Sequence, residues 1–336
     1  MKQTMKTQKA FTFTKRPQPE LHPFLIFYRI IMFTSTKKGI LIASICLLPL
    51  NAFAKKTPDY PVGYSIGASK ITPENMAYAR KAGIRYIEVG GLENFCDTSK
   101  MTDKQIMAKL KGMKQDLNKA GIQVWSIHMP FSKDIDLSCG DEAKRNQIIQ
   151  NHKRILAYAA VLQPKFILFH PSFYLGLNER PYRIGQLVKS VNELLPAVEK
   201  TNAEMVIENM LGYDLLRDEK RERPLCRTVD EMVTIMNQLP DQVGVAVDMN
   251  HIKYPEKLID AFGKRVKTLH VSDGDGVNEC HYMPCSGEGL NDWNLILASL
   301  EKAGYKGVFM FESKYKDVAE LPLCYNNLRR AYKESK

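Results

Sequence analysis

Several features that would indicate other classes of protein are missing from this sequence. After residue 54 there is no Gly/Ser-rich linker, no low-complexity tract and no break in composition that would separate two domains. No cysteine pair has the Cys-x-x-Cys spacing of zinc ribbons or dithiol redox centres. The apolar run at residues 39–50 is too short to span a membrane. A single globular domain is therefore the simplest account of residues 60–336.

The N-terminal 54 residues have the pattern of an export signal. Lys37 and Lys38 precede the apolar run, and Ala52-Phe53-Ala54 follows it as a small-residue cleavage site. We therefore expect residues 1–54 to be a leader whose signal peptide, residues 32–54, is cleaved, leaving a periplasmic protein without a stable membrane span. A retained anchor is the alternative, and translation of residues 1–31 is left open.

The charge of the chain is concentrated in this leader. The formal net charge is +11, but residues 1–54 hold eight Lys or Arg and one acidic residue. The remainder has 40 basic and 36 acidic residues, net +4, which is typical of an ordinary surface. We therefore expect no nucleic-acid partner.

Six cysteines remain after cleavage, an even number that permits disulfides in an exported chain. Cys96 and Cys139 follow successive predicted strands, and Cys280 and Cys285 share one loop. Either pair could form a disulfide, and buried thiols are the alternative. The other two cysteines are Cys226 and Cys324.

The chain after the leader alternates between short apolar runs and longer helical patterns. Continuous β-rich runs of this kind are typical of strands buried on both faces of a parallel sheet. They occupy residues 62–67, 84–89, 122–128, 166–170, 205–208, 243–248, 266–271 and 308–311. The pattern predicts a single (β/α)8 TIM barrel, with an open parallel sheet as the alternative.

The helical patterns between these runs have recognisable starts and stops. Thr72 and Thr102 each precede acidic residues as candidate N-caps, and residues 228–231 have the sequence of a capping box. Gly83, Gly121 and Gly304 follow alanines just before predicted strands and are typical helix stops.

Seven of the apolar runs end on a side chain that can bind a metal or transfer a proton. Because the carboxyl ends of barrel strands open onto one rim, these side chains should converge although they are far apart in sequence. They are Glu88, His128, His170, Glu208, Asp248, His270 and Glu312.

Four of them follow the last four predicted strands in succession. Glu208, Asp248, His270 and Glu312 offer three carboxylates and one imidazole, a set that suits one divalent ion such as Mn, Mg, Co or Zn. Each of these residues, taken alone, could instead be a helix-capping or salt-bridged polar residue on the rim. Burying an unpaired acid after an apolar run would be costly, which favours the metal site.

The remaining candidates carry weaker signals. His251 lies three residues after Asp248 and is expected to be a substrate contact or a ligand to a second ion. His128 and His170 could orient a substrate hydroxyl, hold a second metal or bind backbone groups. Glu88 is expected to contact substrate, although it precedes Gly90 and Gly91 closely and turn structure alone is the alternative. His152, in the middle of a charged helical pattern, is expected to be solvated.

The order of these motifs resembles the xylose-isomerase-like barrel superfamily of sugar phosphate isomerases/epimerases and AP endonucleases. The motifs are His-Met-Pro, Phe-His-Pro-Ser, Ile-Glu-Asn, Asp-Met-Asn-His, His-Val-Ser-Asp, Gly-Glu-Gly-Leu-Asn-Asp-Trp and Phe-Glu-Ser. The resemblance implies a (β/α)8 fold and a metal held by Glu208, Asp248, His270 and Glu312. It further implies that Glu208 and Glu312 form the acid/base pair and that His251 contacts substrate.

The sequence also departs from both branches of that superfamily. The endonuclease branch binds three metals, with an Asp and a His from the loop before Gly-Glu-Gly. Alignment on Gly287 places His281 and Met283 there, and a thioether is a poor zinc ligand. His281 is instead expected to contact substrate. The epimerase branch usually has an arginine six residues after its metal histidine, where this chain has Gly276.

The predicted function is an exported, divalent-metal-dependent sugar isomerase/epimerase acting on a ketose or keto-sugar. The metal would polarise the carbonyl, and Glu208 and Glu312 would remove and return a neighbouring C–H proton. Cleavage of 3-keto-glycosides, by lyase or deglycosidase chemistry, is the alternative. An AP endonuclease-like activity and a non-catalytic sugar-binding barrel are further alternatives, and the oligomeric state is left open.

Overall fold

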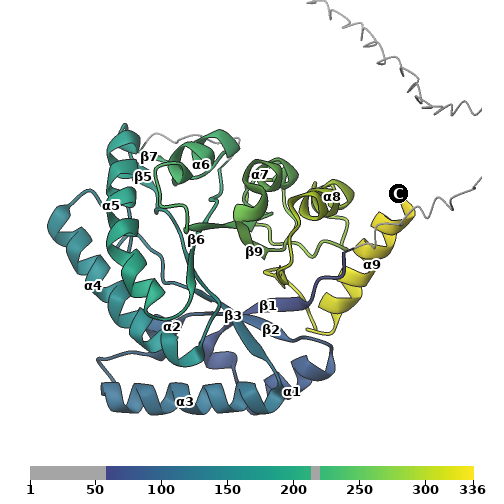
Figure 1. Cartoon of the computed structure of the whole chain (residues 1–336), viewed down its shortest axis with the longest axis horizontal. Helices are drawn as coiled ribbons and strands as arrows, with labels where there is room; N and C mark the ends of the chain where they lie inside the picture. The colour runs from purple at the N-terminus through teal and green to yellow at the C-terminus, as the bar shows by residue number, and fades with distance from the viewer. Residues whose placement is uncertain (1–57, 213–219) are drawn as a thin grey trace, which may run out of the picture. The chain divides into compact units, whose positions relative to one another are not determined.

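The strands form a barrel surrounded by helices. The computed structural model describes residues 58–212 and 220–336, so the predicted leader lies outside the described residues. Eight parallel strands form one sheet in the order β10-β1-β2-β3-β4-β6-β8-β9, with helices around them (Figure 1). A parallel bridge between Val271 and Phe311 joins the two edge strands and nearly closes the barrel. The prediction of a single (β/α)8 barrel is confirmed.

Each predicted apolar run forms a strand whose bounds agree within two residues. Apolar side chains on both faces suit strands that pack against the barrel interior on one side and helices on the other. The strands are β1 (Val62–Gly67), β2 (Tyr86–Gly90), β3 (Gln123–His128), β4 (Phe166–Phe169), β6 (Glu204–Glu208), β8 (Gly244–Asp248), β9 (Val266–His270) and β10 (Phe309–Phe311).

At least one α-helix follows each of these strands. The α-helices are α1 (Pro73–Lys81), α2 (Leu92–Phe95), α3 (Asp103–Ala120), α4 (Glu142–Ala159), α5 (Arg180–Glu199), α6 (Val229–Met236), α7 (Pro255–Phe262), α8 (Trp293–Ala303) and α9 (Glu320–Glu334). Three 3-10 helices are η1 (Ala68–Lys70), η2 (Ala160–Leu162) and η3 (Gly263–Arg265).

The predicted helix caps are present, with one exception in detail. The Thr72 hydroxyl accepts a hydrogen bond from Asn75 N, and Thr102 forms a full capping box with Gln105. Thr228 caps α6 by accepting from Glu231 N. The reciprocal half of that capping box is absent, because the Glu231 carboxylate instead accepts from Arg180 Nη1 at 2.7 Å and Arg227 N at 3.1 Å.

A second, two-stranded sheet was not predicted. It pairs β5 (Leu175–Gly176), after β4, with β7 (Arg221–Glu222), after β6, in antiparallel register. Arg180, at the start of α5, supports this sheet through an ion pair in which its Nε lies 3.2 Å from Glu222 Oε2. Two loops at the carboxyl end of the barrel are thereby joined.

The apolar core lies on both sides of the strand layer. The larger cluster packs the strands against the surrounding helices. A smaller cluster of strand residues that includes Trp125, Phe166 and Met310 fills the barrel interior. Trp125 of β3 donates a hydrogen bond to the Thr268 hydroxyl of β9 at 3.1 Å. Because β3 and β9 are not neighbours in the sheet, this bond crosses the interior.

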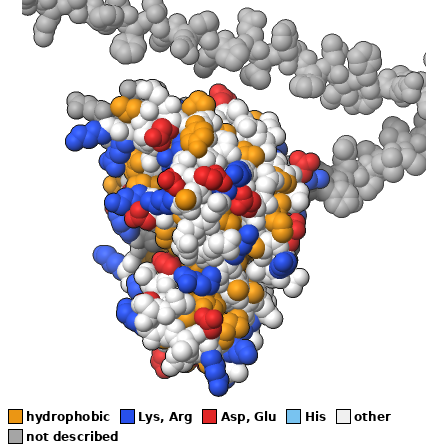
Figure 2. All heavy atoms as spheres, turned by 90° about the vertical axis from the view of Figure 1, so that its left-hand side faces the viewer, with side chains coloured by type: hydrophobic (Ala, Val, Ile, Leu, Met, Phe, Trp, Pro, Cys, Tyr) orange, Lys and Arg blue, Asp and Glu red, His pale blue; other side chains and the backbone are white. Residues whose placement is uncertain are grey.

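The surface carries both signs of charge. On the face shown in Figure 2, basic and acidic side chains are interspersed. Among the described residues, no helix is long and apolar enough to cross a membrane.

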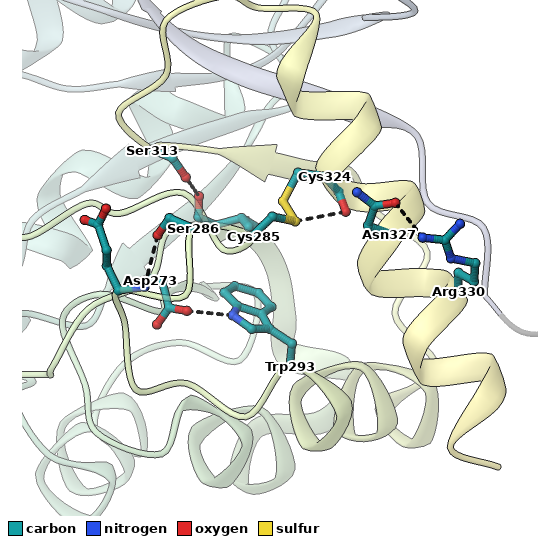
Figure 3. Close-up of a disulfide and its surroundings, with 10 residues drawn as sticks. Asp273, Cys285, Ser286, Trp293, Ser313, Cys324, Asn327 and Arg330 are labelled. Atoms are coloured by element: carbon teal, nitrogen blue, oxygen red, sulfur yellow. Dashed lines mark hydrogen bonds between the residues drawn. A yellow bond between two sulfur atoms is a disulfide. The ribbon is translucent and has the colours of Figure 1, made fainter.

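Neither cysteine pairing that the sequence left open is present, and the alternative of buried thiols holds for Cys96 and Cys139. The disulfide joins Cys285, in the loop after β9, to Cys324 on α9 (Figure 3). Cys96, Cys139 and Cys280 are free thiols, as is Cys226. The returning C-terminal helix lies beside the Cys285 loop, a proximity that strand and loop order could not reveal.

His152 is also not solvated as predicted. Its side chain is buried on the inner face of α4, edge-on to the Phe169 ring at 5.4 Å between centroids. The charged residues flanking it occupy the other faces of the helix, so the average polarity of the segment was misleading.

Candidate metal centre and active site

The four predicted metal ligands converge at the carboxyl ends of the last four strands. His270 Nδ1 lies 3.0 Å from Glu208 Oε1, 2.8 Å from Glu312 Oε2 and 3.8 Å from Asp248 Oδ2. One ligand atom from each of the four lies within 4.8 Å of the others. This spacing suits one coordination sphere, and the assignment as ligands stays a prediction.

Neighbouring groups orient two of these side chains. Asp248 Oδ1 accepts from the backbone N–H groups of Asn250 (2.6 Å) and His251 (3.2 Å). Asn209 holds the Asp248 backbone through both its N–H and its carbonyl. Asp248 Oδ2, although buried, accepts no hydrogen bond in the described structure and neither does Glu208 Oε2. Buried carboxylate oxygens left without a hydrogen-bond donor are what a cation would satisfy.

Glu88 lies behind His270 and not in the wall of the cavity. Its Oε1 is 2.9 Å from His270 Nε2, a close contact in which neither atom makes a hydrogen bond, and its Oε2 accepts from the Ser126 hydroxyl at 2.6 Å. Metal-binding histidines usually donate their second ring N–H to such a carboxylate. This position favours orientation of His270 over the predicted contact with substrate.

A second group shares Glu208 with the first. His170 Nε2 lies 3.2 Å and His128 Nε2 3.6 Å from Glu208 Oε2. One ligand atom from each of the three side chains lies within 4.8 Å of the others, close enough to hold one ion. His128 fulfils one of the three roles left open for it, because its Nδ1 contacts the backbone oxygen of Met129 at 2.9 Å. This contact leaves Nε2 available to a ligand.

A third group contains Glu279, which sequence reasoning did not single out. Glu279 Oε2 lies 3.2 Å from His251 Nε2 and 3.0 Å from His281 Nε2. Met283, which alignment on the glycines placed at a ligand position, does not belong to this group. A Glu-x-His pair before Gly-Glu-Gly was the available signal, but rigid alignment on the glycines shifted it by two residues.

The loop is held in this register by backbone contacts. Asn250 Oδ1 accepts from Cys280 N and His281 N, both at 3.1 Å, and Asp273 and Tyr282 exchange backbone hydrogen bonds. Gly276, where an arginine was expected from the epimerase branch, has φ 73°. A Cβ there would lie 2.6 Å from Lys253 N. The backbone approach therefore requires glycine.

Three of the site histidines share one arrangement. The Nδ1 atoms of His128, His251 and His281 face the backbone oxygens of Met129 (2.9 Å), Asn209 (3.0 Å) and Glu312 (2.9 Å). In each case donation from Nδ1 to the backbone leaves Nε2 facing a carboxylate group, where it can donate a proton or, with a cation between the two groups, offer its lone pair as a ligand. This is the arrangement in which imidazoles bind divalent metals.

Burial and charge act in opposite directions on these histidines. Burial alone would lower each pKa, but Glu208 beside His128 and Asp248 beside His251 outweigh it. The pKa of His128 is raised to about 9 and that of His251 to about 10. For His170, burial prevails over Glu208 and the pKa is lowered. Burial raises the pKa of Asp248. Opposite charges are therefore closely paired in this site.

Members of all three metal-capable groups line a cavity of about 370 Å³, and these lining histidines and carboxylates are called its floor here; Asp248 and His270 are not part of the lining. This volume lies in the range of small-molecule sites. The predicted residues His128, His170, Glu208, His251, His281 and Glu312 all line it. The lining also includes six largely apolar side chains that the sequence did not point to, Phe131, Phe173, Tyr174, Met210, Leu211 and Pro224.

Comparisons with known proteins agree with this architecture. Fructoselysine 3-epimerase of Shigella flexneri is 21% identical over 202 residues, covering 59% of this chain and 67% of that protein. An uncharacterized protein of Methanocaldococcus jannaschii is 24% identical over 208 residues, covering 61% of this chain and 76% of its own.

Solved structures resemble the chain in fold. A D-tagatose 3-epimerase-like protein matches with a TM-score of 0.66 at 17% identity, over 82% of this chain and 99% of that one. The 3-keto-D-glucoside 4-epimerase of E. coli matches with a TM-score of 0.60 at 15% identity, over 81% and 100%. The family model described as xylose isomerase-like TIM barrel matches residues 76–335. The chain belongs to the xylose isomerase-like TIM barrel family.

Proposed function

We propose that this protein is an exported, divalent-metal-dependent isomerase or epimerase of a ketose or keto-sugar. The observation that carries the proposal is the convergence of Glu208, Asp248, His270 and Glu312 in one cluster, of which Glu208 and Glu312 line a cavity of substrate size. The sugar epimerases among the similar proteins support the reaction class.

The four side chains fit a divalent cation because they offer carboxylate oxygens and His270 Nδ1 in one cluster, with Glu88 behind Nε2. A bound cation would polarise the substrate carbonyl and favour loss of a neighbouring proton. Of the four, Glu208 and Glu312 line the cavity.

Glu208 and Glu312 are the proposed acid/base pair. A carboxylate that removes a proton on one face, while the second returns one on the other, would invert the carbon between them. Glu312 is the more open of the two, with 27% of its side chain exposed against 1% for Glu208. His128, His170, His251 and His281 would bind substrate oxygens.

The experiment is an epimerisation assay with the Mn-loaded protein on D-fructose, D-tagatose and a 3-keto-glucoside, following solvent deuterium incorporation by NMR. Glu208→Gln and Glu312→Gln should each abolish exchange while thermal unfolding changes little. Glu288→Gln, an exposed carboxylate outside the cavity, is the matched control. Full activity in either site variant would remove that residue from the mechanism.

Keto-glycoside cleavage is the second candidate for the same site. Proton removal beside the carbonyl could expel a glycosidic oxygen from the next carbon. The apolar side of the cavity offers room for the departing group. Release of an aglycone from a 3-keto-glycoside without any epimerised product would favour cleavage.

An endonuclease-like reaction gains one argument from the structure. The group of His251, Glu279 and His281 removes the objection that Met283 raised, since three metal-capable groups are present among the described residues. The test is nicking of an abasic duplex by the zinc-loaded protein. Nicking at a rate above that of sugar turnover would replace the epimerase proposal.

The export proposal rests on residues 32–54, which lie outside the described residues. Cell fractionation with N-terminal sequencing of the mature protein tests it. We expect a periplasmic protein that begins at Lys55, and an intact N-terminus in the cytoplasm would refute export.

A further inference from the structure

The cavity has two chemically different halves. The floor presents histidines and carboxylates, whereas a second set of lining side chains, here called the apolar wall, consists of Phe131, Phe173, Tyr174, Met210, Leu211 and Pro224. The proposed proton transfer uses only the floor. The apolar wall is therefore available to a part of the substrate that does not react.

The apolar wall is built from loops that are fastened to each other. Phe173 and Tyr174 follow β4, Pro224 follows β7, and the β5–β7 sheet joins the two segments. Arg180 Nη1 donates to Pro224 O at 3.2 Å, and Leu225 N donates to the Ser172 hydroxyl at 2.8 Å. A wall held in this way is formed before the ligand arrives, which lowers the entropic cost of binding.

Two of its aromatic rings are held in place and remain open to the cavity. Phe131 is 54% exposed, yet its ring stacks on His170 with centroids 3.9 Å apart. The Arg221 guanidinium lies 4.1 Å from the Tyr174 ring centroid, and Arg223 Nη1 donates to the Tyr174 hydroxyl at 2.7 Å. Exposed aromatic surface at a cavity mouth is typical of a binding platform.

The apolar wall suits a planar apolar group better than a second sugar ring. The hydroxyl oxygens of Ser172 and Tyr174 each accept a hydrogen bond from the protein, so each hydroxyl has only its single O–H group to donate to a ligand. Most hydroxyls of a second sugar would face apolar side chains, and burying them without partners is unfavourable. An aromatic ring would instead bury apolar area against Tyr174 and Met210.

We propose that the substrate is a glycoside with a planar, apolar aglycone, whose sugar ring occupies the floor and whose aglycone lies against the apolar wall. This inference rests on the proposed sugar chemistry and names its substrate class. It assigns the apolar wall as a specificity subsite.

Equilibrium binding of phenyl glucoside and methyl glucoside, matched in anomer, to the Mn-loaded full protein tests the inference by calorimetry. Neither ligand carries the keto group, so turnover does not interfere. We expect phenyl glucoside to bind roughly tenfold more tightly, which corresponds to about 1.4 kcal/mol. Tyr174→Ala should reduce that preference to below about threefold, whereas Tyr174→Phe should retain it.

Leu295→Ala, an exposed apolar residue on α8 outside the cavity, is the control and should change neither affinity. Phe131→Ala is the second variant if Tyr174→Ala does not fold. Equal affinities for the two glucosides would overturn the inference, as would an unchanged preference in the folded wall variants. Ketose epimerisation without phenyl preference would overturn this inference alone. Tyr174-dependent phenyl preference without any epimerisation would refute the epimerase proposal and leave the subsite standing.

Discussion

The disulfide between Cys285 and Cys324 allows a quantitative prediction. It closes a loop of 39 residues that contains β10 and α8 and connects the site loop to α9 (Figure 3). The chain-entropy relation gives about 3.9 kcal/mol of stabilisation for a loop of that length. Unfolding entropy is about 2.1 cal/mol/K per residue, over the roughly 280 residues of the barrel. Loss of the disulfide should therefore lower Tm by about 7 °C.

Cys285→Ser is the preferred change because Cys285 is exposed whereas Cys324 is buried. Urea unfolding followed by circular dichroism would measure the loss, with non-reducing peptide mapping of the wild-type protein to verify the pairing. Cys280→Ser is the matched control, since Cys280 is a free thiol in the same loop. Destabilisation by Cys280→Ser, or a loss below about 1 kcal/mol with Cys285→Ser, would refute the reasoning.

Three further predictions follow from the site and its surroundings. Glu88→Gln should weaken Mn binding about 10- to 100-fold, because His270 Nε2 loses its carboxylate partner; an unchanged titration would contradict this. Burial lowers the pKa of His152 to about 4. Keeping His152 neutral in the folded state therefore adds up to roughly 3 kcal/mol to the free energy of unfolding. This contribution is complete above about pH 6.5 and is lost as the pH falls toward 4. His152→Leu should flatten that part of the unfolding profile, and an identical slope in both proteins would exclude it. Mn at 100 times its Kd should raise the free energy of unfolding by about 2.7 kcal/mol, an effect that EDTA reverses and His270→Ala removes.

Local patterns in the sequence were sufficient to predict the barrel and the convergence of four polar residues at the strand ends. Strands buried on both faces need continuous apolar runs, so the runs themselves marked the eight strands. A polar residue at the end of such a run has to lie on the rim. Glu208, Asp248, His270 and Glu312 could be grouped on that basis, because strand order places the ends of β6, β8, β9 and β10 side by side.

What the local pattern could not supply were contacts between segments that no periodicity relates. The partner of Cys285 depends on where the C-terminal helix returns, and the burial of His152 depends on which face of α4 meets Phe169. Glu279 entered the site only through the register that Asn250 and Asp273 impose on its loop.

The sequence by itself determined the alternation of strands and helices and the polar residues at the ends of the strands, because both follow from short-range burial. Only the tertiary structure decided which loops meet above the floor, as in the β5–β7 pairing that builds the apolar wall. Loop pairing depends on long-range packing, and the residues involved carry no local signature of their partners.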